Sequence, residues 1–163
     1  MAKSILGLAK LEQKLKRLPD VARAEIKAAI EAQAEEIVRL ARNLAPIEDG
    51  DLRASIGWTW GAPPRGSITL GKVAAAALGK DLTVTVYAGD EKAFYARWVE
   101  FGTAPHNVAK GGGNKSFSGA RVGHPGAAAK PFFFPAYRAS RKRAKSTIRK
   151  AVREAAKKVA AGS

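Results

Sequence analysis

The segment between Pro19 and Pro46 constrains the fold more than any other part of the chain. Its apolar residues recur every three or four positions, which is the period of one helix face. Proline is poorly tolerated inside a helix, so the two prolines bound the segment, and Asp20 is placed to cap its first turn. The sequence predicts a long helix whose stripe packs into a core or against a neighbouring subunit: Ile26, Ile30, Ala34, Ile37, Ala41 and Leu44.

Two further helices are expected, one on each side of this segment. Leucines at positions 8, 11, 15 and 18 predict a short amphipathic helix over 4–18 that ends at Pro19. A C-terminal helix is predicted from about Pro135. Its apolar stripe is thin: Tyr137, Ala144, Ile148, Ala151 or Val152, Ala155 and Val159.

The middle of the chain has the pattern of short strands. After the turn dipeptide Asp49-Gly50, the residues Ile56, Trp58 and Trp60 alternate with period two, which is typical of a half-buried strand. A second clean alternation runs over 81–89, and residues 67–70 form a weaker one.

Three segments are harder to assign. Residues 72–80 fit either a helical turn or a hairpin arm, and 94–101 favours a helical turn that passes into a strand. Residues 102–130 are rich in Gly, Ala and Pro, and a loop of that length in a compact domain is usually functional or ordered only on binding.

The predicted fold class is therefore α+β, a small antiparallel β-sheet packed by a long N-terminal helix and a basic C-terminal helix. A chain of 163 residues fits one domain. We expect a helical arm over 1–19, a core over 20–136 that includes the long loop 102–130, and a basic helix over 136–163.

Positive charge is concentrated at the C-terminal end. The whole chain carries a net charge of +15, and residues 130–163 hold eleven Lys/Arg against one Asp/Glu. Such a field indicates DNA or an acidic protein face as a neighbour, although a solvated helix kept for solubility would look the same. No aromatic or Asn/Gln array accompanies the charges, so any DNA contact should be sequence-blind. The candidate contacts are Arg138, Arg141, Lys142, Arg143, Lys145, Arg149 and Lys150.

Several function classes lack their sequence signals. The chain has no cysteine and no apolar run of about 18 residues, so neither a disulfide framework nor a membrane helix is expected, and the N-terminus does not read as a signal peptide. His106 and His124 have no cysteine nearby, few acidic residues around them and no common metal spacing. We therefore predict no catalytic residue, cofactor or metal.

Glu100 is the one residue that raises a catalytic question. It lies in "YARWVEFGTAPH" at 95–106, among aromatic residues. A lone carboxylate needs an acid, base or metal partner for chemistry, and buried charges persist only when they are paired. We predict a structural Glu100 that accepts hydrogen bonds from the Gly102–Thr103 turn or from Arg53.

The run "PFFFPA" at 131–136 places much apolar area in little chain. If the run is extended, alternate Phe side chains point in opposite directions. One face then enters the core, and the other is covered either by the sheet and N-terminal helix or by a partner.

Three pieces of the sequence, in this order, resemble the tailed-phage tail-component family, which supplies neck, tail-completion and tail-terminator proteins. They are "APIEDGDLRASI" at 45–56, "YARWVEFGTAPH" at 95–106 and "HPGAAAKPFFFPA" at 124–136, and the resemblance spans about 20–155. Phe133 replaces the family's Leu, and 62–80 is longer than the usual connection. The matching positions are Gly50, Leu52, Arg53, Ser55, Glu100, Phe101, Gly102, Thr103, Pro131, Phe132, Pro135 and Ala136.

The resemblance implies a virion structural protein, not an enzyme, with a role in head–tail joining or tail completion. It implies a self-assembled ring, with a hexamer favoured, between connector or stopper proteins and the tail tube or tail terminator, and nonspecific DNA in the lumen. The location would be the virion neck or tail, after assembly in the host cytoplasm. The long helix stripe, the Phe run and the 102–130 loop are candidates for the ring contact. A sequence-nonspecific DNA-binding protein is the alternative, and an enzyme using Glu100 and the histidines is a third hypothesis.

Overall fold

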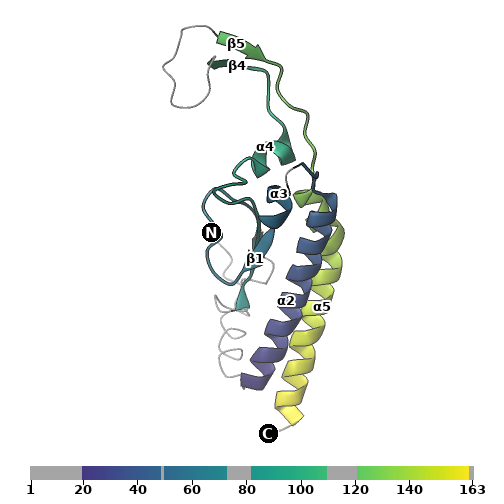
Figure 1. Ribbon diagram of the computed structural model, residues 1–163. Helices are drawn as coiled ribbons and strands as arrows, with labels where there is room; N and C mark the ends of the chain where they lie inside the picture. The colour runs from purple at the N-terminus through teal and green to yellow at the C-terminus, as the bar shows by residue number, and fades with distance from the viewer. Residues whose placement is uncertain (1–19, 49, 73–81, 110–120, 162–163) are drawn as a thin grey trace, which may run out of the picture.

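The computed structural model describes residues 20–48, 50–72, 82–109 and 121–161. The architecture is α+β, as predicted, with two long helices beside a small sheet (Figure 1). The predicted helix over 4–18 and nearly all of the ambiguous segment 72–80 lie outside the described residues. The elements are α2 (Asp20–Leu44), α3 (Asp51–Ala54), β1 (Gly57–Thr59), β2 (Ile68–Lys72), β3 (Thr85–Ala88), α4 (Ala96–Phe101), β4 (His106–Ala109), β5 (Arg121–His124) and α5 (Phe133–Ala161).

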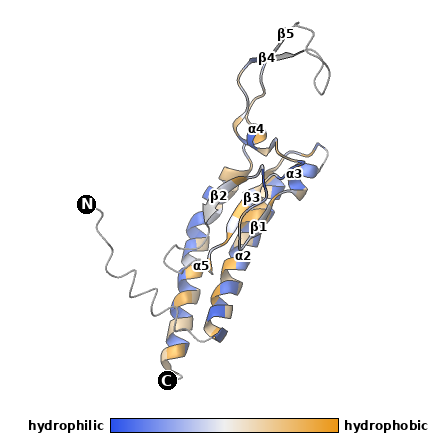
Figure 2. Ribbon diagram, turned by 90° about the vertical axis from the view of Figure 1, so that its left-hand side faces the viewer, coloured by the Kyte–Doolittle hydropathy of each residue, from blue (hydrophilic) through white to orange (hydrophobic). Residues whose placement is uncertain are grey.

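Helices α2 and α5 lie side by side in opposite directions and form the long axis of the molecule (Figure 1). The predicted stripe of α2 is buried from Ile26 to Ala41, whereas Leu44, the last residue of the helix, is 47% exposed. On α5 the buried positions are mostly small, including Ala136, Ala144 and Ala155. Small side chains let the two helix backbones approach closely. This packing explains how α5 can join the core although its apolar stripe is thin. Figure 2 shows the contrast between the apolar and polar faces of both helices.

The sheet has three antiparallel strands in the order β1-β3-β2. In the central strand β3, Val86 and Ala88 are buried while Thr85 and Tyr87 are half-buried, which is the predicted alternation. Trp58 pairs with Val86, and the indole N–H groups of Trp58 and Trp60 donate to Glu35 and Glu31 of α2. These two bonds join one edge of the sheet to the long helix.

The sequence-based boundaries need four corrections. Between the turn at Gly50 and the predicted strand, which is present as β1, lies an unpredicted short helix, α3, in which Ala54 and Ser55 donate their amides back to Gly50 and Asp51. Residues 96–101 form a helix that does not continue into a strand. The 102–130 segment contains paired strands, β4 and β5, which we call the arm. The Phe run is not extended, since α5 already begins at Phe133, not at Pro135.

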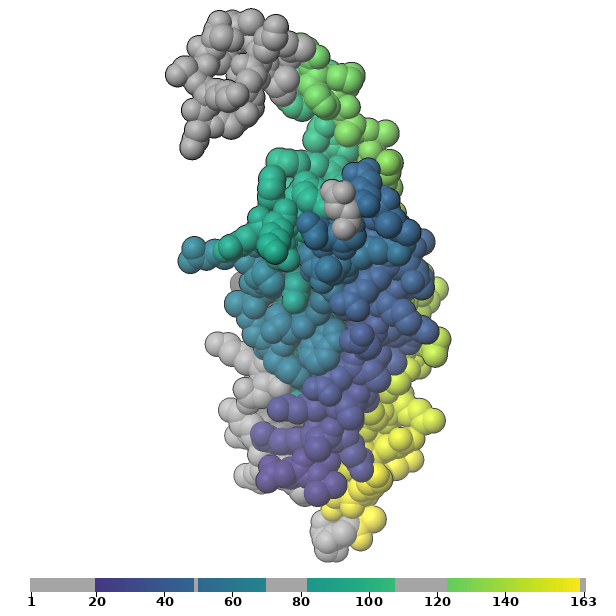
Figure 3. Space-filling view, viewed as in Figure 1, coloured from purple at the N-terminus to yellow at the C-terminus, as the bar shows by residue number. Residues whose placement is uncertain are grey.

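The arm projects from the end of the body at which α3, α4 and the start of α5 lie (Figures 1 and 3). Strands β4 and β5 pair with each other and with no strand of the main sheet. Among the described residues, no helix is long and apolar enough to cross a bilayer.

Replacing Ile37 with Ala should destabilise the fold by about 2–5 kcal/mol, because Ile37 is fully buried on α2 and the change leaves a cavity. Leu44→Ala, at the exposed end of the same helix, should change the free energy of unfolding by about 0.5 kcal/mol or less. Urea denaturation of both variants measures the difference. If both variants lost the same free energy of unfolding, the conclusion that the buried stripe of α2 ends at Ala41 would be wrong.

Candidate functional site

Glu100 is a buried helix cap. Its side chain is 3% exposed, and its Oε2 accepts hydrogen bonds from the amides of Phe132 and Phe133, both at 2.8 Å. Its Oε1 accepts from the Phe134 amide at 3.0 Å. The first amides of a helix have no partner within the helix, so Glu100 of α4 satisfies them from 32 or more residues away in the sequence.

The donors that the sequence predicted for Glu100 are wrong. The Gly102 amide donates to the Trp98 carbonyl, and the Thr103 amide donates to the Ala127 carbonyl. Arg53 Nε donates to the Ala45 carbonyl at 3.2 Å. Instead, the positive end of the α5 dipole and three amides stabilise the carboxylate. Among the described residues, no cation forms an ion pair with Glu100.

The Phe run owes its conformation to this cap. Phe132 and Phe133 are fully buried, and Phe134 is half-buried with its ring 5.7 Å from that of Phe101. Pro135 lies in the first helical turn, where its missing N–H is not needed. Two of the three Phe side chains therefore belong to the protein's own core, and only Phe134 is partly exposed.

Gly102 and Thr103 hold the base of the arm. Gly102 has φ +71°, and a Cβ there would lie 2.6 Å from the Ala127 carbonyl oxygen. Thr103 and Ala127 exchange backbone hydrogen bonds of 2.9 and 3.1 Å, and Thr103 Oγ1 also accepts from the Ala127 amide. The Glu-Phe-Gly-Thr piece thus caps α5, admits the returning chain and pairs with it.

The two histidines of the arm are the next paired residues after Thr103 and Ala127 at its base. His106 and His124 are cross-strand partners with stacked rings, 4.9 Å between centroids. The Gly126 amide donates to His124 Nδ1, and His106 Nδ1 lies 2.9 Å from the Ala104 carbonyl oxygen. They are exposed surface groups of the arm.

The other matching piece, residues 50–55, joins three elements. Gly50 has φ +83° ahead of α3, Leu52 is buried, and Ser55 Oγ donates to the Leu52 carbonyl while accepting from the Gly89 amide at 3.1 Å. Arg53 binds the end of α2 through Ala45. These side chains position α3 against the end of β3.

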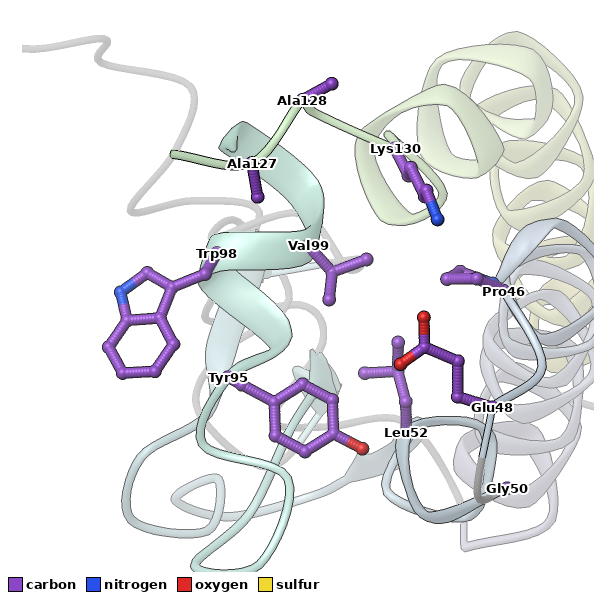
Figure 4. Close-up of a pocket in the computed structure, with 10 residues that line it drawn as sticks. All are labelled: Pro46, Glu48, Gly50, Leu52, Tyr95, Trp98, Val99, Ala127, Ala128 and Lys130. Carbon is purple, nitrogen blue, oxygen red and sulfur yellow. The ribbon is translucent and has the colours of Figure 1, made fainter. Parts of the chain in front are cut away.

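A pocket of about 180 Å³ opens between α3 and α4 (Figure 4). Leu52, Tyr95 and Val99 form its apolar wall, and the side chains of Glu48 and Lys130 stand on its rim. The exposed acids Glu48 and Asp51 lie on the α3 side. We call this surface, residues 46–48 and 50–52 with Phe94 and the outward face of α4, the shoulder.

The shoulder also carries exposed aromatic rings. Phe94, Trp98 and Phe101 are 53%, 51% and 58% exposed, and the Phe94 and Trp98 rings meet edge to face at 5.4 Å. Exposed apolar groups in such a cluster are typical of a protein–protein contact. Of these three residues, sequence reasoning selected only Phe101. Phe94, Trp98 and Phe101 are four and three residues apart, and this helical spacing could have identified them as one set.

The cations of α5 divide into two groups. Arg143 pairs with Glu36 of α2 at 2.9 Å, Lys158 pairs with Glu25, and Lys150 lies 3.9 Å from Glu154. The remaining predicted contacts are exposed and form no ion pair within the described part of the chain: Arg138, Arg141, Lys142, Lys145 and Arg149. Arg138, Lys142, Lys145 and Arg149 are spaced four, three and four residues apart, so they follow one side of the helix.

The candidate site thus combines a buried carboxylate that caps a helix, glycines that admit the returning chain, and exposed aromatic rings beside an apolar pocket. The chain matches the model of the family described as "Bacteriophage HK97-gp10, putative tail-component" over residues 9–102. Because the match covers more than half of the chain, the protein belongs to this family of phage tail components, and the predicted resemblance is confirmed. The Pro-Phe piece at 131–136 lies beyond the matched range. Neither a curated protein nor a solved structure matches the chain significantly.

Replacing Glu100 with Gln should destabilise the fold by about 1–3 kcal/mol, because one amide oxygen cannot satisfy the three backbone amides, two of them buried, that the carboxylate binds. Thermal unfolding followed by circular dichroism measures the loss. Glu91→Gln, an exposed change of the same chemistry, is the control and should leave stability unchanged within about 0.5 kcal/mol. Identical melting curves for the two variants would remove the capping role.

Proposed function

We propose that this tail component forms a ring at the head–tail junction or the top of the tail tube, where it joins or completes the tail. The proposal depends on one observation: the core is fully covered within the chain, whereas one end of the molecule exposes surface that a partner could bind. The buried faces of α2 and α5 pack on each other, while the shoulder and the arm at one end remain exposed. Membership in a tail-component family supplies the context.

A ring requires one heterologous contact repeated until it closes. Of the three segments that the sequence offered for this contact, the α2 stripe and two of the three Phe residues are internal. The arm is the remaining segment, and the exposed shoulder is an additional candidate for the contact. We propose a homo-oligomeric ring, with six copies as the expected number, that contacts connector or stopper proteins on one side and tail-tube or tail-terminator proteins on the other. Assembly would take place in the host cytoplasm before the ring enters the virion.

The row formed by Arg138, Lys142, Lys145 and Arg149 favours contact with DNA that passes through the lumen. Each phosphate that a cation neutralises releases counterions, so such contact weakens as salt rises. The row carries no aromatic side chain that could read bases, which supports a sequence-blind contact. A free-standing, sequence-nonspecific DNA-binding protein that uses the same row is the second candidate function.

Phage assembled without this protein should accumulate heads and tails that have not joined, or tails of abnormal length. Electron microscopy of lysates counts joined particles, and a plasmid copy of the gene should restore them. Normal joining and normal tail length in its absence would contradict the proposed role.

Replacing Arg138, Lys142, Lys145 and Arg149 together with Ala should weaken duplex DNA binding and lower the slope of log K against log salt by up to about 3–4 units. Fluorescence anisotropy over a salt series measures both quantities. The control removes the same charge from exposed sites elsewhere, Arg39, Arg65, Lys92 and Arg97, and should change the slope less. If the two variants lose affinity equally, the contact is diffuse and the row has no special role.

A further inference from the structure

Two opposite charges stand on the rim of the pocket between α3 and α4. Glu48 comes from the segment that precedes α3, and Lys130 comes from the segment that precedes α5 (Figure 4). Both side chains are exposed, and neither forms an ion pair among the described residues. The exposed Asp51 adds a second carboxylate on the α3 side. The pocket therefore has an acidic lip and a basic lip whose charges are not neutralised within the described part of the chain.

The space between the two lips is apolar and has a definite size. Leu52, Tyr95 and Val99 form its wall, and its volume is about 180 Å³. An apolar protein cavity of about 150 Å³ is large enough to bind benzene. The pocket therefore has room for one phenyl ring or one branched aliphatic side chain.

Hydrogen bonds within the chain fix the walls of the pocket before any partner binds. The Lys130 amide donates to the Val99 carbonyl at 2.8 Å, so the segment that leads to α5 is held on α4. On the opposite wall, Ser55 Oγ donates to the Leu52 carbonyl at 2.8 Å and holds the end of α3. A preformed apolar pocket with a few polar groups at its mouth is the usual form of a binding site, and little ordering is needed to fill it.

The described surface of a second copy offers little that could fill this pocket. Among the described residues, the large exposed apolar side chains on or next to the shoulder are Leu44, Ile47, Phe94, Trp98 and Phe101, and Val21 lies at the other end of α2. The first group would place shoulder against shoulder, an isologous contact that pairs two copies and cannot continue into a ring. Val21 is smaller than the ring that the pocket can hold. Another protein is therefore the better source of the occupant.

We infer that the pocket binds a peptide segment of another protein, which inserts one aromatic or branched aliphatic side chain and carries a cation on one side of it and an anion on the other. Residues two apart in an extended segment lie on the same face, so charges two residues from the anchor reach Glu48 and Lys130. Trp98 lines the pocket and is 51% exposed, so it can pack on the segment from the side. The inference goes beyond the proposed ring, because it does not require copies of the chain to contact one another.

Short peptides test the anchor. The probes are acetyl-Lys-Ser-Phe-Ser-Glu-amide, its reverse acetyl-Glu-Ser-Phe-Ser-Lys-amide, and the two matching peptides with Ala in place of Phe. Each is titrated at millimolar concentration into the full chain, and NMR follows the Val99 and Lys130 amides and the Trp98 indole. At least one Phe peptide should bind at least ~10-fold more tightly than its Ala counterpart, because the buried phenyl group adds apolar area.

Reversal of one lip tests the charges. In Glu48→Lys both lips are cationic, so acetyl-Glu-Ser-Phe-Ser-Glu-amide should bind about 2–5-fold more tightly than the mixed-charge peptide, which is the reverse of the wild-type order. Asp20→Lys makes the same change of charge at the opposite end of α2 and should keep the wild-type order. Both positions are exposed, so circular dichroism should show unchanged folding.

The inference is wrong if neither Phe peptide binds more tightly than its Ala counterpart, or if Glu48→Lys keeps the wild-type order. It is also wrong if dilution of the chain alone shifts the same NMR signals, because the occupant is then a second copy. Sedimentation of the wild-type chain separates these results from the proposed ring. A closed oligomer that binds none of the peptides would leave the ring standing, whereas a monomer that binds them as expected supports the pocket without the ring.

Discussion

The three hydrogen bonds from the start of α5 to Glu100 hold together the end of the molecule at which α3, α4 and the arm lie. Phe132 and Phe133 are buried, so water cannot satisfy the first amides of a 29-residue helix. A carboxylate has to reach them from elsewhere in the chain, and α4 carries it. Once α4 is fixed against α5, Gly102 and Thr103 fix where the arm leaves the body, and Trp98 and Phe101 are fixed facing outward. Core stability and the geometry of the exposed surface therefore depend on the same residue.

The distribution of charge follows a related division. Acids on α2 engage both the sheet, through the indoles of Trp58 and Trp60, and the flanks of α5, through Arg143 and Lys158. Exposed ion pairs of this kind add little stability each, typically 0–1 kcal/mol, so the apolar contact of α2 with α5 remains the main source. The pairs instead distinguish the cations of α5 that bind α2 from the exposed row that forms no ion pair among the described residues. A net charge of +15 makes copies of the chain repel one another at long range.

Sequence reasoning was accurate where the physical signal is local and periodic. The bounds of α2 follow from two prolines and a 3.6-residue period, and the alternation of β3 follows from a period of two. It missed the helix that ends before Ser55, the end of α4 at Phe101 and the strands within 102–130, because those conformations depend on long-range bonds. Ser55 binds Gly89, and the arm's base is held by Thr103 and Ala127, 24 residues apart. The polar, glycine-rich composition of the arm gives no periodic signal for a strand.

For the site, the sequence alone identified the types of residue to examine. These are a lone carboxylate among aromatic groups, glycines at sharp turns and a cluster of cations on the last helix. It could not determine what Glu100 binds, because the donors are backbone amides that every residue possesses and only the fold selects. Nor could it separate buried Phe132 and Phe133 from exposed Phe94 and Trp98, since both sets are equally apolar. Tertiary structure made that distinction, because burial depends on which surfaces α2, α5 and the sheet cover once they pack.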